Sequence, residues 1–227
     1  CVWTKNLGTA NSWVALDSSR GFNKTLKLET ADGEGTNSYV GYGIESDFFA
    51  STGIKANGGG SPGFNNSTAT QLVHGWRANG GTTSTNTSGT ITTTVQANTA
   101  AGFSILTYTG TGTNATLGHG LSQAPDTIWF KNRDQNDSWL VYMNVPGLGN
   151  NKFVLLDSHV GSSVSGTAYL QATSPTSTVI SVGDEHKLNA SGEKYVAYCW
   201  HNVEGYSKFG QFTGNGNEDG PYVYTGF

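Results

Sequence analysis

The chain has 227 residues, a net charge of -4 and only 12% charged residues, so it offers no basic surface for nucleic acid. No apolar run approaches the roughly 18 to 20 residues of a membrane-spanning helix, which argues against membrane insertion. The 32 glycines, together with 35% hydrophobic and 11% aromatic residues, favour short strands and tight turns around a substantial core. We therefore expect an all-β protein.

The first predicted strand carries a Trp-x-Lys motif and is followed by a Ser-Trp step, and both features return about 126 residues later. The matched positions, in chain order, are Trp3 with Trp129, Lys5 with Lys131, Trp13 with Trp139, residues 23–29 with residues 151–157, residues 55–57 with residues 187–189, and residues 73–80 with residues 197–204. Chance matches would not keep this order. The sequence therefore predicts two copies of one module.

Between the two copies lies a stretch rich in Thr, Ser and Asn, residues 82–101. Such a low-complexity polar composition is typical of an extended linker. The alternation from Ile91 to Val95 allows one edge strand within it. We interpret residues 82–101 as a linker.

A Tyr/Phe-Thr-Gly segment opens the second copy and returns at the end of the chain. Residues 108–113 resemble residues 212–217, and Gly120-Leu121 resembles Gly226-Phe227, at a separation of about 105 residues. We interpret each segment as a hairpin that begins a module. The first copy lacks this hairpin, and no charged-then-apolar leader precedes its first strand. We expect the chain to be processed or to be part of something longer.

The predicted fold is all-β, with two tandem β-sandwich modules of jelly-roll or concanavalin-like type. The strands expected in the complete module are residues 104–108, 127–131, 138–142, 152–156, 178–182 and 194–200. The predicted divisions are a module lacking its first hairpin at residues 1–81, the linker at 82–101, a complete module at 102–205, and a hairpin at 206–227. This last hairpin could complete a following module or a neighbouring subunit.

No pattern of side chains indicates an enzyme. The carboxylates stand mostly in Gly- or Asn-flanked turns, without the facing pair of a glycosidase. There is no Gly-x-Ser-x-Gly elbow, and the glycine clusters carry no phosphate-binding Lys-Ser or Lys-Thr. No two histidines have metal-binding spacing, and His119 is interpreted as a turn residue bonded to the backbone. Asp17 and Arg20 are spaced to pair across a tight turn.

We expect no cofactor, although two loops could present oxygen atoms to a calcium ion. The loop residues concerned are Asp134, Asn136 and Asp137 in one loop, and Asn215, Asn217 and Asp219 in the other. The glycine placement of a helix-loop-helix calcium site is absent, which favours solvated turns. Cys1 and Cys199 make no disulfide framework, although a single pair remains possible. The apolar surroundings of Cys199 predict a buried thiol.

The six tryptophans recur at matching module positions, which favours core packing. Exposed aromatic rings can also stack on sugars, so Trp13 and Trp139 are candidate contacts for a cell-surface glycan.

The order of motifs resembles repeated modules in large virion and tail-fibre-like proteins of marine bacteriophages, cyanophages included. The motifs are Tyr-Thr-Gly, Gly-His-Gly-Leu, Ala-Pro-Asp-x-Ile-Trp-Phe-Lys, Ser-Trp and Ser-Gly-x-x-Tyr-Val-Ala-Tyr. The resemblance covers nearly the whole chain, and it implies a β-sandwich protein at a virion surface or in an extracellular position, without catalytic residues. In such proteins a short Pro-containing loop joins the Gly-Phe end of one module to the next Val-Trp-x-Lys strand. That loop is missing here.

We therefore hypothesise a non-enzymatic surface or fibre protein in which residues 206–227 supply the missing strands of a neighbour. The expected assembly contacts are Phe209, Phe212, Tyr222, Val223, Tyr224 and Phe227 on one side and Val2 and Trp3 on the other. A covalent alternative is that the chain is a fragment of one long repeat protein. Two further alternatives are a secreted carbohydrate-binding module or adhesin, and a sandwich-fold glycan hydrolase.

Overall fold

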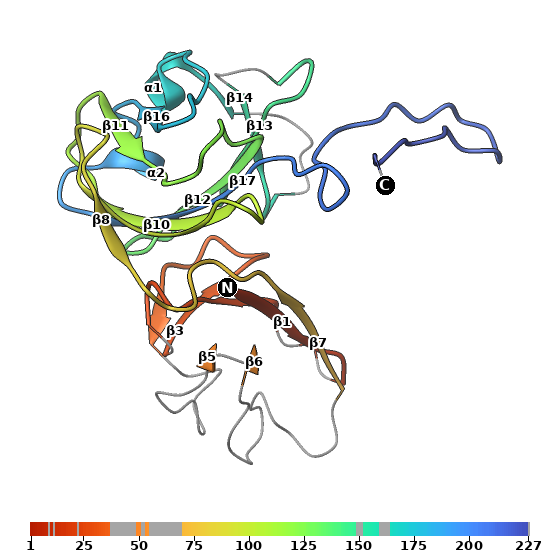
Figure 1. Ribbon diagram of the computed structural model, residues 1–227, viewed down its shortest axis with the longest axis horizontal. Coiled ribbons are helices and arrows are strands. Elements are labelled where there is room, and N and C mark those ends of the chain that lie inside the picture. The colour runs from red at the N-terminus through yellow and green to blue at the C-terminus, as the bar shows by residue number, and fades with distance from the viewer. Residues whose placement is uncertain are drawn as a thin grey trace.

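In the computed structural model, strands make up 38% of the described residues and helices 4% (Figure 1). The strands form several antiparallel sheets, so the predicted all-β sandwich class is confirmed. The structure describes residues 1–8, 10, 12–21, 23–36, 49–50, 53–54, 70–148, 152–158 and 164–226.

The first sheet comes from the N-terminal part of the chain. Its strands are β1 (Val2–Asn6), β2 (Val14–Leu16), β3 (Lys24–Lys27), β4 (Gly35–Thr36) and β7 (Gln71–Gly75), in the order β4-β3-β2-β1-β7. The short strands β5 (Phe49–Ala50) and β6 (Gly53–Ile54) pair with each other and lie on the outer side of this sheet (Figure 1). Side chains alternate along β1, so that Trp3 points toward the second sheet.

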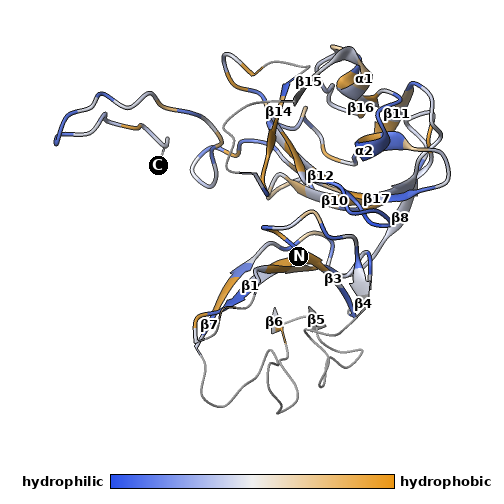
Figure 2. Cartoon of the chain, turned by 180° about the vertical axis from the view of Figure 1, so that it is seen from behind, coloured by the Kyte–Doolittle hydropathy of each residue, from blue (hydrophilic) through white to orange (hydrophobic). Residues whose placement is uncertain are grey.

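The second sheet has eight strands and forms the middle layer. Its strands are β8 (Ser84–Asn86), β9 (Thr93–Asn98), β10 (Phe103–Thr109), β12 (Thr127–Asn132), β13 (Leu140–Met143), β14 (Lys152–Leu155), β15 (Val164–Ser165) and β17 (Lys194–Trp200), in the order β15-β14-β13-β12-β17-β10-β9-β8. β17 is apolar on both faces because it is covered on both, and all but its first residue are buried. Hydrophobic residues lie along the strands of both sheets (Figure 2).

The two sheets share one strand order and one register wherever the sequence repeats. β4, β3, β2, β1 and β7 correspond to β15, β14, β13, β12 and β17. Trp3 is opposite Ala15 and His74 in the first sheet, as Trp129 is opposite Val141 and Tyr198 in the second. The strand pairing therefore repeats along with the sequence.

The second sheet separates two hydrophobic cores. One core lies against a third layer formed by β11 (Ala115–Gly118), β16 (Val179–Val182), α1 (Thr167–Leu170) and α2 (His186–Asn189), and contains Phe130, Tyr142 and Leu170. The other core lies between the two large sheets and contains Trp139, Tyr198 and Trp200. The first sheet thus uses the second as its packing partner. A division into tandem, separately packed modules stays a prediction.

Residues 82–101 are not a linker, because they supply β8 and β9 to the edge of the second sheet. β9 pairs with β10 from Asn98 opposite Phe103 to Thr94 opposite Thr107. Val95 is buried in the core of the third layer. The polar composition does not exclude strands here, because strands of an antiparallel sheet with one face in water need only one apolar face.

The segment from Tyr108 to Leu121 is not a hairpin, because its two strands lie in different sheets. β10 pairs with β9 and β17, whereas β11 pairs with β16. The intervening Gly110 and Gly112 donate backbone hydrogen bonds to Glu193 and Asn189, which direct the chain from one layer to the other. Within residues 206–226, the corresponding C-terminal segment forms no strand and extends away from the body of the protein (Figure 1).

Replacing Phe130 with Ala tests how much the core between the second sheet and the third layer contributes to stability. Phe130 is 0% exposed, so we expect the free energy of unfolding to fall by about 3–5 kcal/mol in urea denaturation. Leu7→Ala is the control, because Leu7 is 58% exposed and its removal should change the value by less than about 0.5 kcal/mol. Equal effects of the two substitutions would contradict the assignment of the core.

Candidate functional site

Tryptophans at equivalent positions of the two copies meet between the sheets. Trp3 stacks on Trp129 with ring centroids 4.6 Å apart and planes 27° apart. Trp76 lies 4.4 Å from Trp3 and 5.9 Å from Trp200 between ring centroids. The prediction that these repeated tryptophans serve packing is therefore confirmed, and the packing occurs between the copies.

A buried ionic network joins the sheets beside these rings. The Asp17 carboxylate accepts the backbone N–H groups of Ser19 and Arg20, which forms a tight turn, and pairs with the Arg20 guanidinium at 2.5 Å. The predicted Asp17–Arg20 pair is confirmed. The Tyr198 hydroxyl of the second sheet donates to the same carboxylate. Burial alone would raise the pKa of Asp17, but Arg20 and Tyr198 outweigh burial and lower that pKa.

Further polar bonds cross the same interface and join this network through Arg20. Glu34 of the first copy accepts hydrogen bonds from Arg133 of the second at 2.8 and 2.9 Å, and also from Arg20 at 3.2 Å. The Lys131 ammonium donates to the carbonyl of Ala31. Both sheets are thus held in one relative position by paired groups as well as by the rings.

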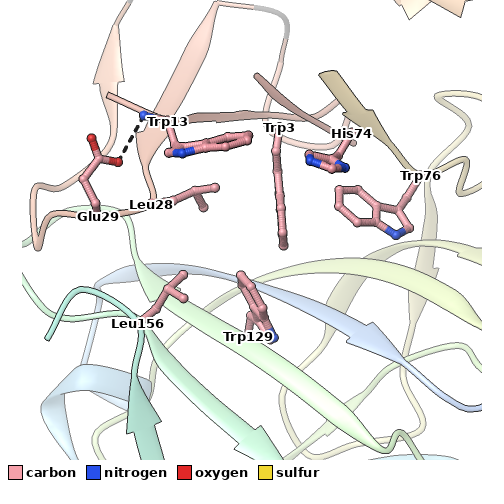
Figure 3. Close-up of a pocket in the computed structure, with 8 residues that line it drawn as sticks. All are labelled: Trp3, Trp13, Leu28, Glu29, His74, Trp76, Trp129 and Leu156. Carbon is pink, nitrogen blue, oxygen red and sulfur yellow. Dashed lines mark hydrogen bonds between the residues drawn. The ribbon is translucent and has the colours of Figure 1, made fainter. Parts of the chain in front are cut away.

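An apolar cavity of about 520 Å³ opens between the sheets beside the stacked tryptophans (Figure 3). Its lining residues are Trp3, Trp13, Leu28, Glu29, His74, Trp76, Trp129 and Leu156. The Trp13 ring stacks on the His74 ring at 5.8 Å, as Trp139 stacks on Tyr198 at 6.1 Å in the second copy. Glu29 accepts the backbone N–H of Trp13 at 3.1 Å. The cavity therefore presents ring faces and few polar groups.

The two candidate glycan contacts have different environments. Trp139 is 0% exposed, and its indole N–H donates to the Lys27 carbonyl at 2.7 Å, so it cannot contact a sugar. Trp13 is half-buried and lines the cavity. The candidate glycan contact at Trp139 is wrong because the first sheet covers this ring, and the core packing favoured by the repeat is observed there.

The first sheet ends at β7, and in the described part of the chain β7 pairs with β1 alone. The Trp76 N–H donates to Cys1 and the Leu7 N–H to Thr70, so even-numbered residues of β7 point their backbone groups at β1. The backbone N–H and C=O groups of Gln71, Val73 and Gly75 therefore point away from the sheet. This open edge could not be predicted from the sequence, because a sequence does not show the order of the strands in a sheet.

At the corresponding edge of the second sheet, β10 pairs with β17 along its whole length, from Phe103 opposite Trp200 to Thr109 opposite Lys194. The strand order shows that β7 lacks this partner in the described residues. β1 lies between β2 and β7, so Val2 and Trp3 do not form an acceptor edge. That expectation is corrected: Val2 is buried within the sheet, and Trp3 lines the cavity.

The other predicted assembly residues lie on the C-terminal segment, apart from Phe227, which is outside the described residues. Tyr222 is 89% exposed, Phe212 67% and Tyr224 65%, and Val223 is also exposed. Phe209 is half-buried, with its ring centroid 6.3 Å from that of Trp200. Several large apolar side chains exposed on one segment are typical of a contact surface.

The two candidate calcium loops use their oxygens within the protein. The Asp134 carboxylate accepts the Lys194 N–H, and the Asn136 side-chain oxygen accepts the Gly33 N–H. Asn215 accepts the Asn217 N–H, which closes a small turn. Among the described residues, no group of three or more His, Cys, Asp or Glu side chains could hold a metal ion.

The remaining candidate groups are buried and structural. Cys1 and Cys199 are both free and buried, and burial raises the pKa of the Cys199 thiol, so the expected buried thiol is confirmed. His119 accepts the Leu121 N–H through Nδ1 and donates from Nε2 to the Thr176 carbonyl, each at 3.2 Å. These bonds confirm the prediction that His119 is bonded to the backbone. In the part that the structure describes, no helix is long and apolar enough to cross a membrane.

The family described as Domain of unknown function (DUF7483) matches residues 1–227, so the chain belongs to this family. Comparisons with curated proteins and with solved structures find no match. The family assignment thus covers the whole chain and leaves its function to be inferred from the geometry.

The buried His119 predicts a pH dependence of stability. Burial lowers the pKa of His119 to about 4, from the value of 6.5 that histidine has in an unfolded chain. The unfolded state binds more protons between these values, so stability should fall by about 2 kcal/mol from pH 7 to pH 5. His119→Gln keeps a donor for Thr176 and should reduce this loss. Urea denaturation at both pH values measures it, and an equal loss in the two proteins would contradict the assignment.

Proposed function

We propose that this chain is a non-enzymatic structural module of a virion-surface or extracellular fibre, which joins to further copies by adding a β-strand at β7. One observation carries the proposal. β7 has no second partner in the described chain at the edge where its counterpart β17 carries β10, and residues 207–213 repeat the position of β10 without forming a strand. The protein thus has an acceptor edge and a donor segment that do not meet within one copy.

Strand addition would pair the outward backbone groups of β7. An open edge exposes N–H and C=O groups that can pair with another chain, and an added strand satisfies them. The β10–β17 ladder supplies the template for the added strand, because the β1–β7 pair and the β12–β17 pair have the same register. The same addition would cover part of the apolar surface of residues 206–226.

The non-enzymatic part of the proposal is supported by how the charged groups are used. Asp17, Glu34 and Arg133 bind partners across the interface between the sheets, and so serve packing. The virion or extracellular setting rests on the resemblance of the repeated motifs to tail-fibre-like modules. The donor segment can reach β7 of a separate subunit or of the following module in a longer chain, since both use the same edge.

A second candidate function, glycan binding, is favoured by the half-buried Trp13 ring in the cavity wall. Sugar sites combine ring faces with hydrogen-bonding groups, whereas Glu29, which carries the carboxylate among the described residues of this wall, already accepts the Trp13 N–H. The shortage of polar groups favours an apolar occupant. Strand addition is therefore the better supported function.

Substituting Val73 with Pro tests strand addition. The Val73 N–H points away from β1, so Pro removes a donor from the open edge and leaves the β1–β7 hydrogen bonds in place. We expect self-association, measured by sedimentation over a range of concentrations, to weaken by about tenfold or more. Val73→Ala keeps the N–H and should associate like the unsubstituted chain. A monomeric unsubstituted chain, or equal association of both variants, would refute strand addition.

Trp13→Ala tests glycan binding. If Trp13 holds a sugar, binding to a glycan array should be present and should be lost in this variant. Trp139→Phe is the matched control, because the Trp139 ring is buried. On the function proposed above, neither the unsubstituted chain nor the variants bind glycans at Trp13, and a signal that depends on Trp13 would favour the second candidate.

A further inference from the structure

We infer that the aromatic cavity is the socket for Phe209 of a second copy, whose residues 207–213 lie antiparallel to β7 with Phe209 opposite His74. This inference rests on the proposed function and specifies its register and its central contact. The occupant is thus a second copy of this module.

The register follows from two equivalences. In the second sheet, Ile105 of β10 is opposite Tyr198 of β17. His74 takes the place of Tyr198, because it is opposite Trp3 as Tyr198 is opposite Trp129. On the donor side, Phe212-Thr213-Gly214 matches Tyr108-Thr109-Gly110, which aligns Phe209 with Ile105. Phe209 of the added strand therefore falls opposite His74.

The face of the added strand follows from the same template. Ile105 and Tyr198 both point into the core between the two sheets. Directly opposite residues project on one face, with Cβ atoms about 4.5–5.5 Å apart. Phe209 would therefore project on the face of His74, whose ring lines the cavity together with Trp76 and Trp13. In Figure 3 the His74 and Trp76 rings lie together at one end of the cavity.

The cavity has the size and chemistry for this side chain. Its volume is about 520 Å³, and an engineered apolar cavity of about 150 Å³ is enough to bind benzene. His74 already lies among rings, with Trp13 at 5.8 Å and Trp76 at 6.3 Å between centroids. A phenyl ring would add a further aromatic contact to this set.

Neighbouring residues of the donor segment fit the alternation of the template. Phe212 takes the place of Tyr108, which stacks on Tyr195 at 5.1 Å on the opposite face. Phe212 would therefore lie opposite Gln71 on the outer face of the first sheet, where the side-chain nitrogen of Gln71 is buried without a hydrogen-bond partner among the described residues. Residues 221–224 correspond to β11. The C-terminal segment would therefore supply the strand added to β7 and also the equivalent of β11.

Within one copy, Phe209 already lies near a tryptophan, but it is less enclosed than it would be in the cavity. Its ring lies 6.3 Å from Trp200, the counterpart of Trp76, and remains half-buried. The Phe209 N–H donates to the Asn202 side chain at 2.6 Å. Association therefore exchanges a contact at the end of β17 for one in the cavity of a second copy.

Disulfide trapping in the full chain tests the register. By the same template, Gln211 falls opposite Leu72, as Thr107 is opposite Val196. This pair is not hydrogen-bonded, and its Cα separation suits a disulfide. The double variant Leu72→Cys with Gln211→Cys should form intermolecular disulfides on oxidation. Leu72→Cys with Gly210→Cys should not, because a shift of one residue turns the thiol to the other face.

Phe209 substitutions test the socket. Phe209→Ala should weaken self-association by about tenfold or more, whereas Phe209→Leu should keep most of it. Urea denaturation of both variants checks that the fold persists. The unsubstituted chain is the control for oxidation, since Cys1 and Cys199 are both buried.

The outcomes separate the inference from the proposed function. Trapping of the Leu72–Gln211 pair alone, with weaker association of Phe209→Ala, supports the socket. Association that Val73→Pro abolishes, without trapping of this pair or without an effect of Phe209→Ala, overturns the socket and leaves strand addition standing. Absence of association in the unsubstituted chain overturns both.

Discussion

The packing of the first sheet on the second, through Trp3 and Trp129, is the interaction on which the rest of the structure depends. It brings equivalent strands of the two copies face to face, and it gives each sheet a partner for its apolar side. The Asp17–Arg20–Tyr198 and Glu34–Arg133 contacts align the two sheets in the plane of this interface. Because Trp76 joins the same cluster, the position of β7 is set by this packing as well.

On the proposed function, the fixed position of β7 defines the register in which a strand would be added. An edge in a loose sheet could pair in several registers, but β7 is held by β1 on one side and by the tryptophan cluster at its end. In the second copy, Phe103 and Ile105 of β10 pack in the core between the two sheets. On the proposed function, a strand added to β7 would place Phe209 on the same face, beside the cavity.

The sequence predicted the fold class, the repeated motifs and the Asp17–Arg20 pair, but not the arrangement of the two copies. Alternation and the Trp-Lys motif identified β1, β12 and β17 because local strand chemistry repeats at each of them. The linker and hairpin interpretations failed because they depend on which strands pair, and β9 and β10 find their partners across the fold. The open edge at β7 is not visible in the sequence for the same reason. The repeat favours core packing of the tryptophans, but it does not distinguish the buried Trp139 from the half-buried Trp13, because burial by a second sheet leaves no trace in local sequence.

Amide hydrogen exchange measures directly whether β7 accepts a strand from another copy, as proposed above. If the claim holds, the outward amides of Val73 and Gly75 exchange rapidly at low protein concentration and become protected as the copies associate. Their counterparts Ala197 and Cys199, already paired with β10, should stay protected at all concentrations. Rapid exchange at Val73 and Gly75 in a fully associated sample would contradict the claim.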